Sequence, residues 1–187
     1  MTSEAAAATA ATLSPLPLVS LTLVLGGARA GKSAYAESLI MTGPAARGLY
    51  LATGSPGDAE MAARIAEHRA RRGPGWVTVE EPLELARALA AHASAERPVL
   101  VDCLTLWLSN LMHEARDVEP ATRAVLDVLP GLAGPVVFVA NEVGLGIVPD
   151  NALARRFRDA AGVMNQTIAR VSDEVEFVVA GLPMRVK

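Results

Sequence analysis

The chain has 187 residues, enough for one domain with a substantial core, and its net charge of −3 argues against a protein that binds nucleic acid through electrostatic attraction. Hydrophobic residues make up 51% of the chain but aromatic residues only 4%, so the core must be mainly aliphatic. Such a core is typical of α/β proteins with buried parallel strands. The single cysteine, Cys103, excludes an intrachain disulfide and suits a cytoplasmic location, which we expect.

Residues 1–18 differ in composition from the rest of the chain. They are rich in Ala, Thr, Ser and Pro and contain one charged side chain, Glu4. The segment lacks the basic region and the compact apolar region of a signal peptide, and its low complexity predicts a disordered tail. We expect residues 19–187 to form a single domain, and no apolar run in the chain is long enough to span a membrane.

Residues 26–33 read Gly-Gly-Ala-Arg-Ala-Gly-Lys-Ser and match G-x-x-x-x-G-K-[ST], the nucleotide-binding P-loop. Residues 19–25 predict a buried strand before the motif and residues 32–41 a helix after it, which is the setting that the motif requires. Glycines let backbone amides approach phosphate oxygens, and the helix N-terminus adds partial positive charge. We expect Lys32 to reach the β- and γ-phosphates and Ser33 to ligate Mg²⁺.

Strand-like and helical segments alternate along the remaining chain. Further strands are expected at residues 48–53, 76–80, 98–102, 135–141 and 174–180, and residues 184–187 are compatible with one more. Helices are expected at residues 58–72, 82–95, from 104, 120–129 and 151–173. This alternation predicts an α/β fold with a mostly parallel sheet and helices on both faces. Ligands of such sheets bind at the carboxyl ends of the strands, where Gly26, Thr53, Asp102 and Asn141 fall.

Asp102 ends the apolar strand that begins near Pro98. An acid in this position is typical of the Walker B arrangement, which holds Mg²⁺, but it also suits the cap of a following helix. Because a P-loop is present in the same chain, we favour the Mg²⁺ role.

The predicted helix at 58–72 is strongly charged and contains His68 beside an apolar stripe. Arg64 and Arg72 lie one turn to either side and disfavour the imidazolium form. A neutral imidazole is a competent nucleophile, and neighbouring guanidinium groups could hold phosphates around it. The pattern by itself describes a half-buried histidine on a salt-bridged helix more readily than a catalytic one.

A polar loop with two glycines follows at residues 141–149. Loops at strand ends often carry function, but the glycines equally suit a structural turn. The sequence leaves both interpretations open.

Seven segments together resemble one family. They are Gly-Gly-Ala-Arg-x-Gly-Lys-Ser at 26–33, Tyr-Leu-Ala-Thr at 50–53, Asp-x-Glu-Met-x-x-Arg-Ile-x-x-His-Arg at 58–69, Trp-x-Thr-Val-Glu at 76–80, Leu-Val-Asp-Cys-Leu-Thr-Leu-Trp-Leu-Ser-Asn at 100–110, Asn-Glu-Val-Gly-x-Gly-Ile-Val-Pro at 141–149 and Arg-x-Phe-Arg-Asp-x-x-Gly-x-x-Asn-Gln at 155–166. Over residues 20–187 the chain closely resembles the bifunctional adenosylcobinamide kinases/adenosylcobinamide-phosphate guanylyltransferases of cobalamin biosynthesis. The P-loop alone is generic, but its combination with the histidine helix and the Asn-Glu-Val-Gly loop is specific.

The resemblance implies two reactions at one nucleotide site. The aminopropanol hydroxyl of adenosylcobinamide is phosphorylated with ATP or GTP, and GMP is then transferred from GTP to adenosylcobinamide phosphate through a guanylylated histidine. By motif match this histidine is His68, and Lys32 is the second catalytic residue. The resemblance also implies a RecA-like P-loop fold, Mg²⁺ held by Ser33 and Asp102, and a homotrimer. The acidic charge balance predicts no nucleic-acid partner.

The family's nucleotide-contacting positions carry over to a larger set in this chain. They are Gly26, Gly27, Ala28, Arg29, Ala30, Gly31, Lys32, Ser33, Ala52, Thr53, Gly54, Arg69, Ala70, Arg71, Arg72, Glu80 and Asp102. The Glu80 carboxylate suits the N1 and N2 donors of guanine. Ala30 stands where the family usually has Ser, a change that removes one hydrogen bond to phosphate.

Two other functions share parts of this pattern. An ordinary P-loop small-molecule kinase would use Lys32, Ser33 and Asp102 but would need no nucleophilic histidine. A non-enzymatic nucleotide switch would need only the P-loop.

Overall fold

The computed structural model describes residues 21–42, 47–54, 66, 70 and 72–187. They contain one seven-stranded sheet in the order β3-β2-β4-β5-β1-β6-β7. All neighbouring strands are parallel except the last pair, so the predicted mostly parallel sheet is confirmed. The strands are β1 (Leu21–Gly26), β2 (Gly48–Ala52), β3 (Trp76–Glu80), β4 (Val99–Asp102), β5 (Val136–Asn141), β6 (Glu174–Val179) and β7 (Leu182–Arg185).

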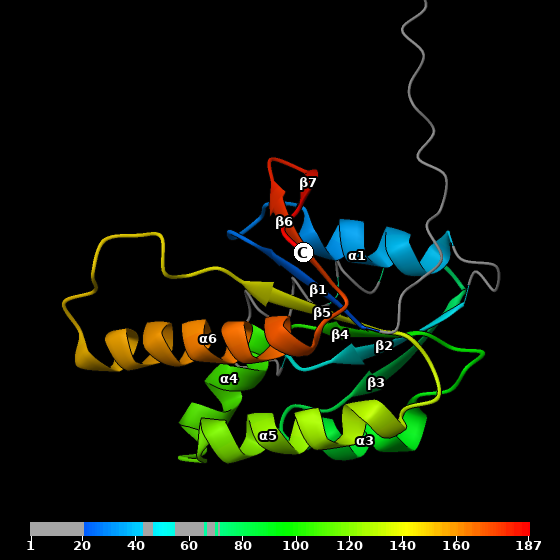
Figure 1. Ribbon diagram of the computed structural model, residues 1–187, viewed down its shortest axis with the longest axis horizontal. Helices are drawn as coiled ribbons and strands as arrows, with labels where there is room; N and C mark the ends of the chain where they lie inside the picture. The colour runs from blue at the N-terminus through cyan, green and yellow to red at the C-terminus, as the bar shows by residue number, and fades with distance from the viewer. Residues whose placement is uncertain (1–20, 43–46, 55–65, 67–69, 71) are drawn as a thin grey trace, which may run out of the picture.

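Helices cover both faces of the sheet, as predicted (Figure 1). Of the described helices, α1 lies on one face and the other four on the opposite face, where they enclose the larger hydrophobic core. The helices are α1 (Lys32–Met41), α3 (Leu85–His92), α4 (Leu104–His113), α5 (Val118–Val128), followed by a short 3₁₀ turn (Leu129–Gly131), and α6 (Ala152–Val171). None of the helices in this described part is long and apolar enough to cross a membrane.

Three element starts within the described ranges differ from the expectations by two or more residues, including that of α5, which begins at Val118 rather than at residue 120. The helix expected from Pro82 begins at Leu85, because Glu81 Oε1 accepts hydrogen bonds from the backbone N–H groups of Leu83 (3.1 Å) and Glu84 (2.9 Å) and holds a turn there. The last strand begins at Leu182, because a tight turn pairs it directly with β6 in antiparallel register. The expected tail and the expected helix at 58–72 lie outside the described residues, apart from single positions in the helix.

Strand register determines what reaches the carboxyl edge of the sheet on the α1 face. Side chains alternate between faces, so residues two apart share one. On the α1 face, buried Val24, Val139 and Leu100 are each followed two residues later by Gly26, Asn141 and Asp102. The apolar rows of β4 and β5 therefore end in the polar side chains of Asp102 and Asn141, and that of β1 ends in the glycine that begins the P-loop.

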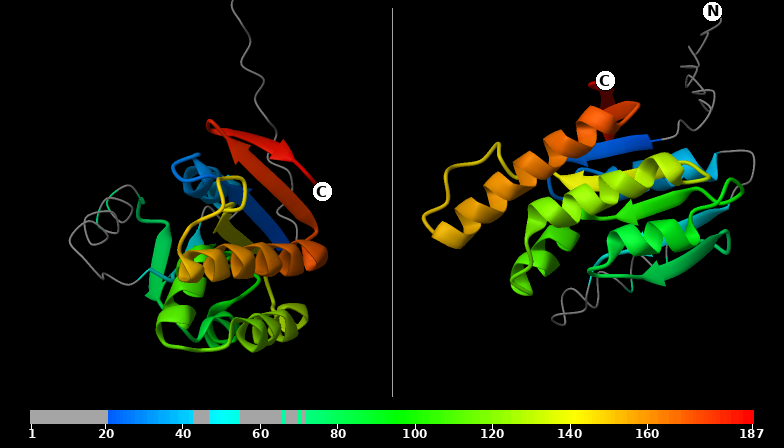
Figure 2. Two further views of the ribbon diagram at one scale, coloured as in Figure 1. Left: turned by 90° about the vertical axis from the view of Figure 1, so that its left-hand side faces the viewer. Right: turned by 60° about the horizontal axis from the view of Figure 1, so that its bottom comes forward.

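The segment from the end of β5 to the start of α6 projects beyond this same edge of the sheet (Figures 1 and 2). Asn151 caps α6, its Oδ1 accepting hydrogen bonds from the N–H groups of Leu153 (2.7 Å) and Ala154 (3.2 Å).

Candidate nucleotide site

The P-loop conformation depends on two glycines. Gly26 has φ 154° and Gly31 has φ 100°, values that residues with a side chain rarely adopt. A Cβ atom at Gly26 would also collide with the backbone carbonyl of Val178 in β6. The turn after β6 holds the loop from the same side, because the Gly181 N–H donates to the Ala30 carbonyl at 2.8 Å. The loop is thus shaped by backbone contacts as well as by its own sequence.

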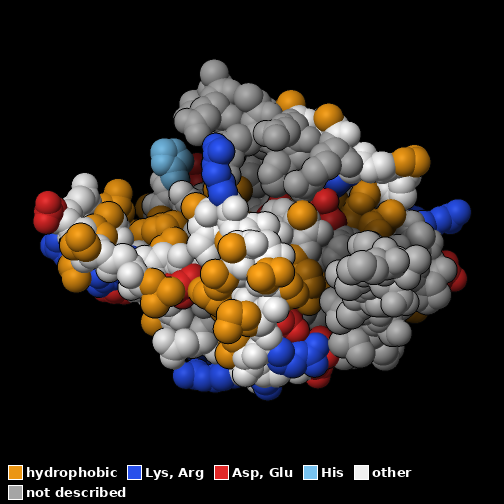
Figure 3. All heavy atoms as spheres, turned by 90° about the horizontal axis from the view of Figure 1, so that it is seen from above, with side chains coloured by type: hydrophobic (Ala, Val, Ile, Leu, Met, Phe, Trp, Pro, Cys, Tyr) orange, Lys and Arg blue, Asp and Glu red, His pale blue; other side chains and the backbone are white. Residues whose placement is uncertain are grey.

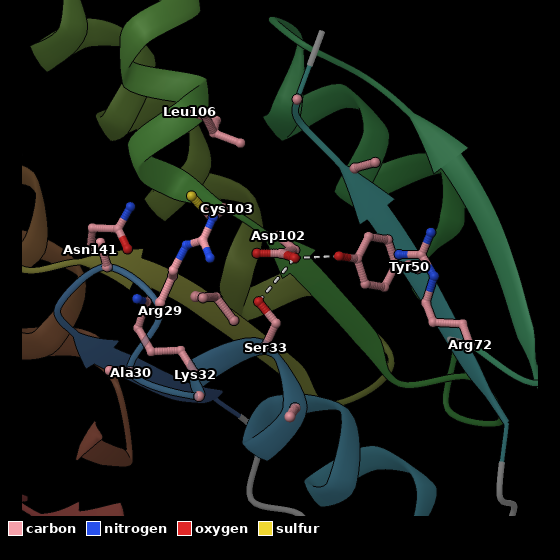
Figure 4. Close-up of a pocket in the computed structure, with 16 residues that line it drawn as sticks. Arg29, Ala30, Lys32, Ser33, Tyr50, Arg72, Asp102, Cys103, Leu106 and Asn141 are labelled. Carbon is pink, nitrogen blue, oxygen red and sulfur yellow. Dashed lines mark hydrogen bonds between the residues drawn. The ribbon is translucent and has the colours of Figure 1, made fainter. Parts of the chain in front are cut away.

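A cavity of about 400 Å³ lies over this loop (Figure 4). It brings together most of the predicted nucleotide-binding residues that the structure describes, namely Ala28, Arg29, Ala30, Gly31, Lys32, Ser33, Ala52, Gly54, Arg72 and Asp102. Gly26, Gly27, Thr53, Ala70 and Glu80 are described but do not line it. His68, Arg69 and Arg71 lie outside the described residues.

Lys32 lies at the floor of the cavity, where it is only 7% exposed. Its Nζ donates a hydrogen bond to the Gly27 carbonyl at 2.6 Å, so the ammonium group is held beside the loop amides. Burial lowers the pKa of Lys32, while the nearby Cys103 and Asp102 act in the opposite direction. The lysine is therefore a desolvated cation placed to bind phosphate.

Asp102 accepts two hydrogen bonds on one carboxylate oxygen. Ser33 Oγ donates to Oδ2 at 3.2 Å, and the Tyr50 hydroxyl donates to the same atom (Figure 4). Burial, reinforced by the Asp102 charge, raises the pKa of Tyr50 and keeps its hydroxyl protonated. Tyr50 therefore orients the carboxylate that faces the P-loop serine.

The Ser33–Asp102 pair fits a magnesium ion. Mg²⁺ in phosphate sites is held by one or two protein oxygens, and its other positions are taken by water and phosphate. The described residues contain no cluster of three or more His, Cys, Asp or Glu side chains that could hold a metal. A hydroxyl and one carboxylate beside a phosphate loop are the donors that a P-loop Mg²⁺ uses.

Arg72 forms the far wall of the cavity. Its Cζ lies 3.3 Å from the centroid of the Tyr50 ring, a cation–π contact, and Trp76 meets the same ring edge-on at 5.9 Å. Within the described part of the chain, the buried Arg72 Nη1 has no hydrogen-bond partner. Arg72 lines the cavity, so its guanidinium charge lies beside any ligand bound there.

Thr53 is fully buried, and its side chain is used in the fold. Its Oγ1 donates to the Cys103 carbonyl (2.8 Å) and accepts from the Cys103 N–H (2.9 Å), which fixes the ends of β2 and β4 together. Glu80 pairs in register with Ala52 at the end of edge strand β3 and is exposed there, as is Ala70. The nucleotide contacts of Thr53, Glu80 and Ala70 stay predictions.

Comparison with known proteins agrees with this geometry. The model of the family "cobinamide kinase / cobinamide phosphate guanyltransferase" matches residues 22–186. The chain belongs to this family. It is 50% identical over 167 residues to the bifunctional adenosylcobalamin biosynthesis protein CobP of Pseudomonas aeruginosa, covering 88% of this chain and 96% of that protein. It is 41% identical over 180 residues to the bifunctional protein CobU of Salmonella typhimurium, covering 88% and 98%.

Membership confirms the predicted family and its enzyme class, a cobinamide kinase and cobinamide phosphate guanylyltransferase. Among solved structures, the flagellar accessory protein FlaH from Methanocaldococcus jannaschii is similar with a TM-score of 0.51 at 11% identity, covering 92% of this chain and 80% of that one. A KaiC-like protein from Pyrococcus horikoshii has a TM-score of 0.51 at 13% identity, covering 88% and 78%. At such identities these likenesses show the fold alone, and they confirm the predicted P-loop α/β fold.

Two pocket residues of this cobinamide kinase were not singled out as site residues from the sequence. The sequence places Tyr50 in a strand, and it places Asn141 at a ligand-binding strand end and in a loop of undecided role without a specific contact. A signal for Tyr50 was present: it is the one aromatic residue in β2, two positions before Ala52 and therefore on the same face of the sheet. Its contact with Asp102 depends on which strands are neighbours, which local sequence does not specify.

Proposed function

We propose that this chain phosphorylates adenosylcobinamide with ATP or GTP and then transfers GMP from GTP to adenosylcobinamide phosphate, and that both reactions of cobalamin biosynthesis use the P-loop cavity. The observation that carries this proposal is the position of Gly54 and Arg72. Both line the cavity, and they flank the segment that contains His68. The segment that contains the predicted nucleophile therefore begins and ends at the phosphate site.

Chain length limits how far His68 can be from the cavity. It precedes Arg72 by four residues, and a fully extended chain covers at most about 3.6 Å per residue. The two Cα atoms are therefore within about 14 Å of each other. A histidine side chain and a nucleotide bridge much of that distance, which supports His68 as the guanylyl acceptor.

In the guanylyl step, an imidazole nitrogen of His68 attacks the α-phosphorus of GTP. The bond between that phosphorus and the α–β bridging oxygen breaks, and pyrophosphate leaves. A phosphate oxygen of adenosylcobinamide phosphate then attacks the same phosphorus, and the N–P bond breaks to restore the histidine. A covalent intermediate of this kind divides one difficult transfer into two easier ones. Lys32 and the guanidinium charge of Arg72, which both line the cavity, would stabilise the developing charge.

In the kinase step, the P-loop amides would bind the α- and β-phosphates, and Lys32 would reach the β- and γ-phosphates. Ser33 and Asp102 would hold Mg²⁺, with the carboxylate oriented by Tyr50. The ion, when bound, neutralises charge that develops on the transferring phosphoryl group. Glu80, at the edge strand beside Ala52, is proposed to accept hydrogen bonds from guanine.

Labelled nucleotides test the guanylyl step. GTP labelled at the α-phosphate should leave an acid-labile, alkali-stable adduct on the protein, whereas GTP labelled at the γ-phosphate should leave none. His68→Ala should abolish the adduct. His92→Ala and His113→Ala are matched controls, because these other two histidines are exposed at helix ends and should keep it. Absence of an α-labelled adduct in the wild type would leave an ordinary P-loop kinase as the better account.

We further propose that the chain forms a homotrimer and resides in the cytoplasm. Support for assembly comes from apolar side chains exposed on the β6–β7 hairpin and on the loop before α6, including Leu182 at 70% and Ile147 at 97% (Figure 3). Light scattering at several concentrations should give three times the monomer mass of 19.5 kDa. A monomer at all concentrations would contradict the trimer but not the chemistry.

A further inference from the structure

The end of strand β5 lies at the centre of the phosphate site. β5 separates β1, which leads into the P-loop, from β4, which carries Asp102. Asn141 is in register with Gly26, whereas Asp102 is in register with Val139. Asn141 therefore extends two residues beyond the level of Asp102, about 7 Å along the strand, and on the same face of the sheet.

Two side chains bond to the backbone of Asn141, and a third hydrogen bond holds the backbone of the next residue. The Asn141 N–H donates to Thr105 Oγ1 of α4 at 2.7 Å, and its carbonyl accepts from Asn165 Nδ2 of α6 at 3.2 Å. Directly after it, the Glu142 N–H donates to the Gly26 carbonyl at 3.0 Å. Thr105 and Asn165 are both buried, so two helices contribute interior polar groups to fix this one backbone position.

The backbone of Asn141 bonds to α4 and α6, whereas its side chain faces the cavity. It lines the cavity together with Arg29 and Lys32, and Figure 4 shows its amide turned toward the Arg29 side chain. In the described part of the chain this amide makes no hydrogen bond of its own. An amide donor with a fixed backbone thus faces the phosphate site from β5, which lies between the strand before the P-loop and the strand that carries Asp102.

The position of Asn141 along the sheet indicates which phosphate group its side-chain amide contacts. P-loop amides surround the α- and β-phosphates, which leaves the γ-phosphate nearest to the strand ends beyond the Mg²⁺ ligands. We propose that Asn141 Nδ2 donates a hydrogen bond to the γ-phosphoryl group and positions it for transfer to the cobinamide hydroxyl. The hydroxyl oxygen bonds to the γ-phosphorus, the bond to the β–γ bridging oxygen breaks, and the hydroxyl proton passes to water. The acceptor in this step rests on the proposed function.

This proposal predicts a separation of the two activities. The bond broken in guanylyl transfer is at the α-phosphorus, so the Asn141 contact contributes to the kinase transition state alone. Loss of one such donor typically lowers kcat by about 10²–10³-fold. Asn141→Ala and the isosteric Asn141→Asp should lower kcat with MgATP and adenosylcobinamide by about that factor and change the KM for MgATP less than about 3-fold. Their rate of adduct formation from α-labelled GTP should remain within about 3-fold of the wild type.

Asn151→Ala is the matched control, because this asparagine caps α6 outside the cavity. It should lower the thermal midpoint and leave the ratio of the two activities unchanged. If both activities fall equally in Asn141→Asp, Asn141 has a structural role only, and the proposal is overturned. It is also overturned if the kinase kcat of the variant stays within 3-fold of the wild type. If the wild type forms no α-labelled adduct, the guanylyl step of the proposed function fails, and the kinase assay still decides the role of Asn141.

Discussion

Two walls of the nucleotide cavity are built in opposite ways. The loop wall consists of residues 28–33 of the P-loop, and its shape depends on Gly26 and Gly31 and on contacts with β6 and the β6–β7 turn. The strand wall is formed by Tyr50 on β2, Asp102 on β4 and Arg72 just before β3, and these side chains meet because β2 lies between β3 and β4. The loop wall is suited to bind any triphosphate, whereas the strand wall can adjust the charge and orientation of what is bound there.

The largest effect is expected from a substitution of Lys32, a buried cationic group of the loop wall that both proposed reactions use. Lys32→Met keeps the length and apolar character of this buried side chain but removes the charge. Both kinase and adduct-forming rates should fall by at least about 10²-fold, because the lysine stabilises charge on the phosphates in each. Loss of only one activity would show that the two reactions use different phosphate sites.

Gly26→Ala tests whether the loop wall depends on backbone space. The added Cβ would meet the Val178 carbonyl at a φ that alanine rarely adopts, so we expect a loss of at least about 2 kcal/mol in the free energy of unfolding. Gly27→Ala is the comparison, since nothing lies within 4 Å of a Cβ there. Urea unfolding of the two nucleotide-free variants should differ by that amount, and equal stabilities would contradict this account.

Tyr50→Phe tests the strand wall. It removes the hydroxyl that donates to Asp102 while keeping the ring that contacts Arg72 and Trp76. Residues that orient a metal ligand commonly contribute about 10-fold or more to metal affinity, so the Mg²⁺ concentration for half-maximal kinase activity should rise by that factor. Tyr35→Phe, on α1 and outside the cavity lining, should not change it. An unchanged Mg²⁺ dependence in Tyr50→Phe would remove the orienting role.

The smallest expected effect is a pH dependence of the free energy of unfolding caused by Cys103, which follows Asp102 and is buried. Burial, with a contribution from Asp102, raises the pKa of this thiol to about 11. Above pH 9 the unfolded chain loses this proton while the folded protein keeps it, so the free energy of unfolding should decrease as the pH rises from 9 towards 11. Tyr50, whose pKa is also raised, adds to the decrease above pH 10.

Urea unfolding between pH 9 and 10 isolates the thiol contribution. Cys103→Ala should flatten the decrease over this interval, whereas an equal slope in both proteins would show that the thiol does not cause it. In the native wild type, a thiol reagent at pH 8 should react only after unfolding.

The two walls also differ in how far the sequence predicts them. The chemistry of the loop wall is local, because eight consecutive residues between a strand and a helix predict it. The contacts of the loop with Val178 and Gly181 are not local and are not predicted by the motif. Asp102 was predicted because it ends an apolar strand, and β4 does end there. The Tyr50–Asp102 contact depends on β2 pairing with β4, a non-local choice that periodicity does not reveal. The Arg72–Tyr50 contact accompanies the pairing of β2 with β3, the strand that follows Arg72 in the chain. Likewise, the start of α3 at Leu85 follows from side-chain bonds of Glu81 that compete with the helix.

The central claim is that one cavity serves both reactions, and a competition experiment tests it most directly. Wild-type protein is incubated with α-labelled GTP and increasing amounts of a non-hydrolysable ATP analogue, and the labelled peptide is mapped by mass spectrometry. The account predicts that GMP is found on His68 and that the ATP analogue suppresses its formation competitively. Label on another residue, or adduct formation that saturating ATP analogue does not reduce, would contradict it.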